Sequence, residues 1–87
     1  MREWPSWWNW ELELSPHLLK RMVDRQFSEV DLRRMLEYAT GLREDVVEGR
    51  WIVEARHVRR PWEVIVEPDF EARTLVVVTA YPLGEDR

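Results

Sequence analysis

Two helix starts lie within residues 15–41, SPHLLKRMVDRQFSEVDLRRMLEYATG. Ser15 is a natural N-cap, and the proline that follows it suits the first position of a helix. Ser28 repeats this signal, with Asp31 at the capping-box position. Because only about two residues separate the expected helices, they are predicted to form a tight αα-hairpin.

The sequence on both sides of this hairpin is typical of strands. Apolar and polar side chains alternate over residues 8–14, which predicts a half-buried strand. Gly41 is expected to end the second helix, and strands rich in Val, Ile, Trp and Thr follow over residues 50–57, 61–67 and 73–81. The last of these is apolar on both faces and is expected inside the sheet. The predicted fold is therefore α+β, in the order β-α-α-β-β-β, with the helical hairpin packed on a four-stranded, mainly antiparallel sheet.

The length and composition limit the classes of protein to be considered. The 87 residues are expected to form a single domain, residues 1–87, with a globular core over 8–82 and a Trp-rich N-terminal tail over 1–7. The chain has no cysteine, which excludes disulfides and thiolate metal sites. No apolar run approaches the ~18 residues of a membrane span, and no signal-peptide core is present, so a cytoplasmic protein is expected. No metal-ligand spacing and no glycine-rich phosphate loop occurs, so neither a metal nor a cofactor is expected.

One face of the first helix carries a polar stripe. His17, Arg21 and Arg25 follow one another at four-residue steps and therefore lie on one side of the helix. An imidazole can move a proton near neutral pH, and guanidinium groups can clamp phosphate oxygens. The helix dipole and Arg21 disfavour the imidazolium form of His17, which suits a general base. The alternative interpretation of His17 is an exposed surface histidine at a helix start.

A second basic segment follows the first strand of the β region. His57 shares the parity of the core-facing side chains, so a half-buried structural histidine is as good an interpretation as an active one. Arg56 points to the other face, where pairing with Glu63 or Glu67 is the alternative to a functional role. Short basic runs such as Arg33-Arg34 and Arg59-Arg60 are usually solvated, but Arg59-Arg60 borders His57 and is the better binding candidate.

The chain contains the pattern His17-x-x-x-Arg21-Met22-x-x-Arg25, followed by Phe27-Ser28-x-x-Asp31, Arg56-His57 and a closing strand that ends at Tyr81. In this pattern it resembles a family of small bacterial domains. These domains are related to the RelE-like and BrnT-like toxins of toxin–antitoxin modules. The resemblance covers roughly residues 12–82. It implies a RelE-like ribonuclease-toxin fold, and metal-independent RNA cleavage by attack of the ribose 2′-OH on the adjacent phosphate.

The resemblance also implies roles for particular residues and partners. The residues implied to be catalytic are His17, Arg21, Arg56 and His57. Those implied to bind substrate are Arg25, Arg59, Arg60 and Tyr81. The expected partners are an RNA substrate and a cognate antitoxin-like protein.

The acidic balance of the chain favours a rival hypothesis. The formal net charge is -4, which argues against non-specific coating of nucleic acid. The chain would then be a non-catalytic protein–protein interaction module of the same fold. Trp4 and Trp7 fall outside the alternation of residues 8–14, so they are expected to bury against a second copy, as a homodimer, or against a partner.

Whether the chain is an enzyme, a possible endoribonuclease, is left open by the sequence. A concave site that joins His17, Arg21 and Arg56 would support catalysis. An open sheet neutralised around Glu54, Glu63 and Glu67 would support the interaction module.

Overall fold

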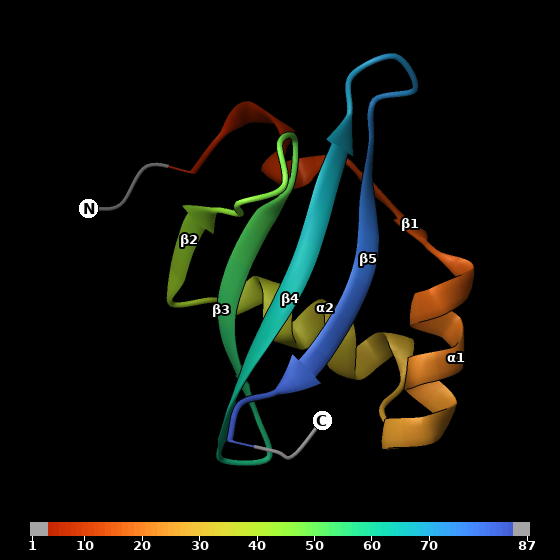
Figure 1. Ribbon diagram of the computed structural model, residues 1–87, viewed down its shortest axis with the longest axis vertical. Helices are drawn as coiled ribbons and strands as arrows, with labels where there is room; N and C mark the ends of the chain where they lie inside the picture. The colour runs from red at the N-terminus through yellow and green to blue at the C-terminus, as the bar shows by residue number, and fades with distance from the viewer. Residues whose placement is uncertain (1–3, 85–87) are drawn as a thin grey trace.

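The computed structural model describes residues 4–84. Its elements, in chain order, are η1 (Ser6–Asn9), β1 (Glu11–Leu14), α1 (Pro16–Arg25), α2 (Glu29–Glu37), β2 (Gly41–Glu44), β3 (Trp51–His57), β4 (Arg60–Asp69) and β5 (Thr74–Pro82). The strands form one mixed sheet of five strands in the order β1-β5-β4-β3-β2. β1 pairs parallel with β5, and every other neighbouring pair is antiparallel. The fold is α+β, and β5 lies inside the sheet as predicted (Figure 1).

The sheet has five strands rather than the predicted four because β2 follows the second helix. α2 ends at Glu37, and Gly41 opens β2 instead of ending the helix. The Thr40 N–H donates to the Glu54 carbonyl oxygen at 2.8 Å, which draws the chain onto β3. A Cβ at Gly41 would overlap the Glu54 carboxylate, so glycine permits this close approach.

The first strand is shorter than predicted. The Trp8 N–H donates to the Pro5 carbonyl at 3.0 Å, and the Trp10 N–H donates to the Trp7 carbonyl at 3.1 Å. These bonds form the short 3-10 helix η1, so β1 begins only at Glu11. The turn points Trp7 inward, where it is 5 % exposed. The prediction that Trp7 has no place in the chain's own core is therefore wrong, because its ring packs 5.5 Å from that of Trp51.

Both helices contribute to the hydrophobic core on one face of the sheet. α2 crosses the sheet behind β3 and β4, while α1 lies beside the second half of β5, where β1 has ended (Figure 1). Ser15 caps α1 by accepting from the Leu18 N–H at 3.0 Å, and Ser28 forms the predicted capping box with Asp31. Leu18 is fully buried, and Trp62 is 5 % exposed. Neither helix of residues 4–84 has the length and apolar character of a membrane span.

Candidate functional site

A cleft of about 360 Å³ lies between α2 and the end of β3. Its lining residues come from two segments far apart in the sequence and include four ionisable groups besides a tyrosine: Asp31, Arg34, Met35, Tyr38, Arg56, His57 and Val58. This volume lies at the lower end of the range typical of small-molecule and ligand sites. Two of the residues predicted to be catalytic, Arg56 and His57, meet in this cleft.

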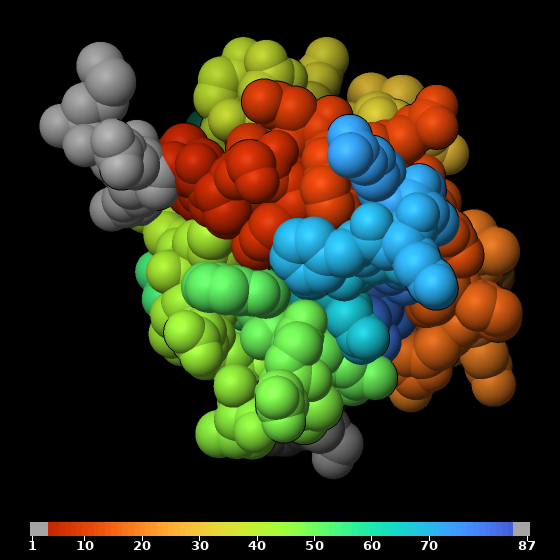
Figure 2. Space-filling view, turned by 90° about the horizontal axis from the view of Figure 1, so that it is seen from above, coloured from red at the N-terminus to blue at the C-terminus, as the bar shows by residue number. Residues whose placement is uncertain are grey.

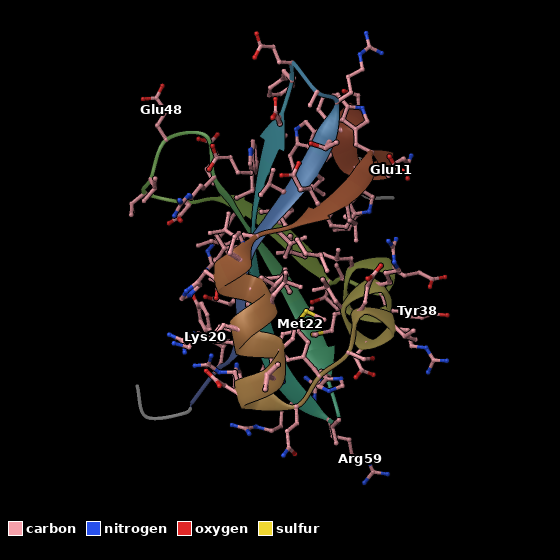
Figure 3. All side chains as sticks on the ribbon, turned by 90° about the vertical axis from the view of Figure 1, so that its right-hand side faces the viewer. Glu11, Lys20, Met22, Tyr38, Glu48 and Arg59 are labelled. Carbon is pink, nitrogen blue, oxygen red and sulfur yellow. The ribbon has the colours of Figure 1, made fainter. Side chains whose placement is uncertain are left out.

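The helix and the strand fix these side chains in different ways. Asp31, Arg34 and Tyr38 recur at three- and four-residue steps, so they occupy one flank of α2. Tyr38 is 73 % exposed and projects from this flank, as the side view in Figure 3 shows. His57 is half-buried, with its ring edge-on to that of Trp62 at 5.4 Å. The imidazole therefore rests on the hydrophobic core while it faces the cleft.

The turn after His57 has an unusual backbone. Val58 and Arg59 both have positive φ, 49° and 63°. This is the backbone of a two-residue hairpin turn that favours asparagine and glycine at its centre. A β-branched residue is disfavoured in this conformation, and such strain concentrates at functional sites. The turn holds Arg59 at its tip (Figure 3), directly after Val58, which lines the cleft.

In the described part of the chain, the arginines around the cleft have no carboxylate within ion-pair distance. Within residues 4–84, no ion pair is formed by Arg34, Arg56, Arg59 or Arg60. Within the same range, the Arg56 side chain donates one hydrogen bond, to the Arg59 carbonyl at 3.2 Å. Several other arginines do bind carboxylates: Arg33 binds Glu29 at 2.8 Å, for example. The cleft and its turn are therefore a local basic site on a chain whose net charge is -4.

Asp31 is the one carboxylate that lines the cleft, and its pKa is lowered from the ordinary value of 3.8. The main cause is the hydrogen bond from the Ser28 backbone N–H, 2.8 Å long. Partial burial opposes this effect, and the Ser28 hydroxyl and the charges of His57 and Arg34 add to it. Asp31 is thus held ionised by the helix cap.

The α1 stripe does not reach this cleft. His17 is exposed, and Arg21 pairs with Asp24 on the same helix at 3.3 Å. Arg25 is half-buried near the end of α1. No α1 residue lines the cleft. The cleft therefore does not join His17 and Arg21 to Arg56.

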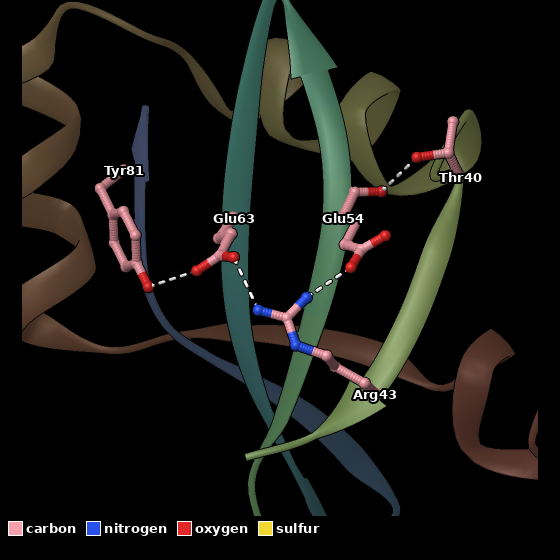
Figure 4. Close-up of polar contacts among 5 residues, drawn as sticks. All are labelled: Thr40, Arg43, Glu54, Glu63 and Tyr81. Atoms are coloured by element: carbon pink, nitrogen blue, oxygen red, sulfur yellow. Dashed lines mark hydrogen bonds and ion pairs between the residues drawn. The ribbon is translucent and has the colours of Figure 1, made fainter. Parts of the chain in front are cut away.

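The sheet surface opposite the helices holds a second polar group. This sheet face comprises Arg43, Arg50, Glu54, Glu63, Glu67 and Tyr81. Arg43 lies between two carboxylates: it contacts Glu54 and binds Glu63 at 2.8 Å (Figure 4). These contacts, led by the hydrogen bond with Glu63, raise the pKa of Arg43.

Two further contacts complete the sheet face. The Tyr81 hydroxyl donates to Glu63 at 2.7 Å, and Arg50 binds Glu67 at 3.1 Å. Tyr81, predicted to bind substrate, therefore lies in this network and not at the cleft. Arg56 was expected to pair with Glu63 or Glu67 as an alternative to function, but Arg43 and Arg50 take those carboxylates instead.

Sequence reasoning did not single out Arg34, Tyr38 and Arg43. Arg34 belongs to a run interpreted as a solvated helix face, and its four-residue spacing from Tyr38 is the signal that would have joined them. Within residues 4–84, no group of three or more histidine, cysteine or carboxylate side chains could hold a metal ion.

A protein-family model matches residues 14–82, a segment that includes every residue lining the cleft. No curated protein and no solved structure matches the chain. The description of the family names no activity and makes no link to the toxins that the sequence pattern resembles. The chain belongs to the family described as Domain of unknown function (DUF4258).

Proposed function

We propose that this chain is a toxin-like domain that binds RNA in the α2–β3 cleft and cleaves it without a metal ion. One observation carries the proposal: two guanidinium groups that form no ion pair among residues 4–84, an imidazole and a phenol converge on one cleft. Guanidinium groups suit phosphate oxygens because they donate paired hydrogen bonds to them. An exposed tyrosine beside them offers a stacking surface for an unpaired base.

The chemistry assigns one role to each cleft residue. His57 accepts the proton of the ribose 2′-OH as its oxygen attacks the adjacent phosphorus. The bond between phosphorus and the 5′-oxygen then breaks, and the imidazolium returns the proton to that leaving oxygen. Arg34 and Arg56 stabilise the extra negative charge of the phosphorane. The products are a 2′,3′-cyclic phosphate and a 5′-hydroxyl, so atoms and protons balance without a metal.

The biological setting of the proposal rests on the resemblance to toxin–antitoxin modules. A cytoplasmic antitoxin-like partner would then neutralise the chain by covering its basic cleft, and an acidic segment would suit Arg34, Arg56 and Arg59. His17, Arg21 and Arg25 take no chemical role here, because α1 contributes nothing to the lining of the cleft.

The interaction module remains a second candidate, favoured by the sheet face. There Arg43 and Arg50 neutralise Glu54, Glu63 and Glu67. A sheet neutralised in this way is the arrangement expected of a non-catalytic module. In that case the chain would bind its partner without any turnover.

The test is the incubation of the purified full chain with a labelled single-stranded RNA in the presence of EDTA. The matched control is DNA of the same base sequence, which lacks the attacking 2′-OH. The proposal expects RNA fragments with 2′,3′-cyclic phosphate ends and intact DNA. Intact RNA, or equal cleavage of RNA and DNA, would overturn it and favour the interaction module.

A further inference from the structure

A second cleft, of about 310 Å³, flanks the other side of α2. Its lining residues come from η1, β1 and the adjoining segment, from α2 and from β5: Trp8, Asn9, Trp10, Leu12, Arg33, Leu36, Glu37 and Leu75. Figure 2 looks onto this end of the molecule, where the N-terminal segment (red) lies between α2 and the β4–β5 turn (light blue). We call it the aromatic cleft.

Two tryptophan rings are held in the wall of the aromatic cleft by other aromatic rings. Trp8 stacks on Trp4, with 4.5 Å between ring centroids and 23° between planes. Trp10 meets Phe70 edge-on, with 5.3 Å between centroids. Both indoles remain half-exposed. They therefore provide large, fixed apolar surfaces of the kind on which unpaired bases stack.

The rim of the aromatic cleft carries one donor and one acceptor, a helical turn apart. Arg33 is fixed by Glu29, which accepts from its Nε at 3.0 Å and its Nη2 at 2.8 Å. Its Nη1 group makes no hydrogen bond within residues 4–84. The Glu37 side chain forms neither a hydrogen bond nor an ion pair with any residue of that range. The rim thus offers an unused carboxylate beside an already oriented guanidinium.

We propose that the aromatic cleft binds a guanine base of the RNA strand whose phosphates occupy the α2–β3 cleft. The inference rests on the proposed function for its RNA ligand. Guanine alone presents two adjacent N–H donors on its Watson–Crick edge, and one carboxylate, here Glu37, can accept both. Its O6 and N7 accept from guanidinium groups such as Arg33. Adenine and cytosine would instead turn a ring-nitrogen lone pair toward Glu37.

A basic side chain of a protein partner would also fit between tryptophans and a carboxylate. Two features of the chain support a guanine base over such a cationic ligand. Arg33, however, places a positive charge at the same rim. The two clefts also lie on opposite flanks of one helix, whose diameter is about 10–12 Å, so a short single strand that crosses α2 reaches both.

The test is an NMR titration of the ¹⁵N-labelled full chain with guanosine and, separately, with adenosine. A nucleoside carries no phosphate, so this measurement reports the base site independently of the α2–β3 cleft. We expect guanosine to shift the amide signals of Trp8, Trp10 and Glu37 more strongly than adenosine does. Glu37→Gln should weaken guanosine binding roughly tenfold and leave adenosine binding unchanged.

The matched control is Glu48→Gln, an exposed glutamate between β2 and β3 (Figure 3), which should bind guanosine like the wild type. Equal shifts for both nucleosides, shifts outside this cleft, or preferential binding of a lysine peptide would overturn the base site. A chain that binds guanosine selectively but leaves RNA intact would overturn the proposed cleavage and support the base site.

Discussion

Both the α2–β3 cleft and the sheet face contain several arginines, but the two regions differ in whether these arginines form ion pairs. On the sheet face, Arg43 and Arg50 are each bound to a carboxylate. At the cleft, Arg34, Arg56 and Arg59 form no ion pair within residues 4–84. The difference teaches that net charge does not describe how charges are arranged, because a chain of net charge -4 can still bring several arginines without ion pairs among residues 4–84 together at one cleft.

The strongest way to break this contrast is to remove the imidazole of the cleft. His57→Ala should lower the rate of RNA cleavage by about 10²–10⁴-fold, the usual contribution of a positioned acid–base group. Arg50→Ala on the sheet face should leave the rate unchanged. Single-turnover cleavage assays measure both rates. Cleavage that survives His57→Ala but is lost in His17→Ala would move the chemistry to α1.

Removing the buried ring that packs against His57 should have the largest effect on stability. Trp62 is buried and meets both His57 and Phe27 edge-on, at 5.4 Å and 5.2 Å. Trp62→Ala should lower the free energy of unfolding by about 3–5 kcal/mol, as for truncation of other buried aromatics. Urea unfolding followed by circular dichroism measures this change. An unfolding midpoint within error of the wild type would show that Trp62 does not support the cleft.

The sheet face should respond to substitution through stability alone. Arg43→Ala removes two ion pairs that are partly exposed, so we expect a loss of about 1 kcal/mol in the free energy of unfolding. Affinity for RNA should not change, because the sheet face lies opposite the helices and outside the cleft. Thermal unfolding and RNA titration of the same variant test both statements. A large loss of RNA affinity would mean that the sheet face belongs to the binding site.

The smallest expected effect is a change of stability with pH that arises from Asp31, the carboxylate that lines the cleft. The pKa of Asp31 is lowered in the folded chain, so its ionised form stabilises the fold. This contribution is complete above the ordinary pKa of 3.8 and is lost as the pH falls from there through the lowered folded value. Asp31→Asn should therefore be less stable than the wild type at neutral pH, and the difference should shrink below pH 3.8. A constant difference in urea unfolding across that range would contradict the lowered pKa.

Much of the fold follows from local sequence signals. The N-caps Ser15 and Ser28 were predicted from residue type and position, and both are confirmed by their hydrogen bonds. The segment GLRE that forms β2 carries no two-residue apolar period, so its strand depends on the neighbouring β3. The alternation at Trp8 and Trp10 misled the prediction because backbone bonds within the turn override side-chain pattern there.

The candidate site was less predictable because it depends on how the helices pack. Strand alternation predicted opposite faces for Arg56 and His57, and only the family resemblance placed both in one site. Arg34 and Tyr38 join them only because α2 lies on β3. α1 packs instead against β5, which separates His17 from His57 despite their similar basic settings. Local signals carry no information about which strand a helix covers.

The most direct test of the central claim is the salt dependence of RNA binding. RNA binding weakens as the salt concentration rises, so a plot of log K against log salt has a negative slope. For single strands, each phosphate contact contributes about 0.7 to the magnitude of this slope. We predict that the double variant Arg34→Ala/Arg56→Ala lowers the magnitude of the slope by about 1.4, while Arg43→Ala/Arg50→Ala leaves it at the wild-type value. Equal slopes for the wild type and the cleft variant, or a loss confined to the sheet-face variant, would contradict the assignment of the cleft as the RNA site.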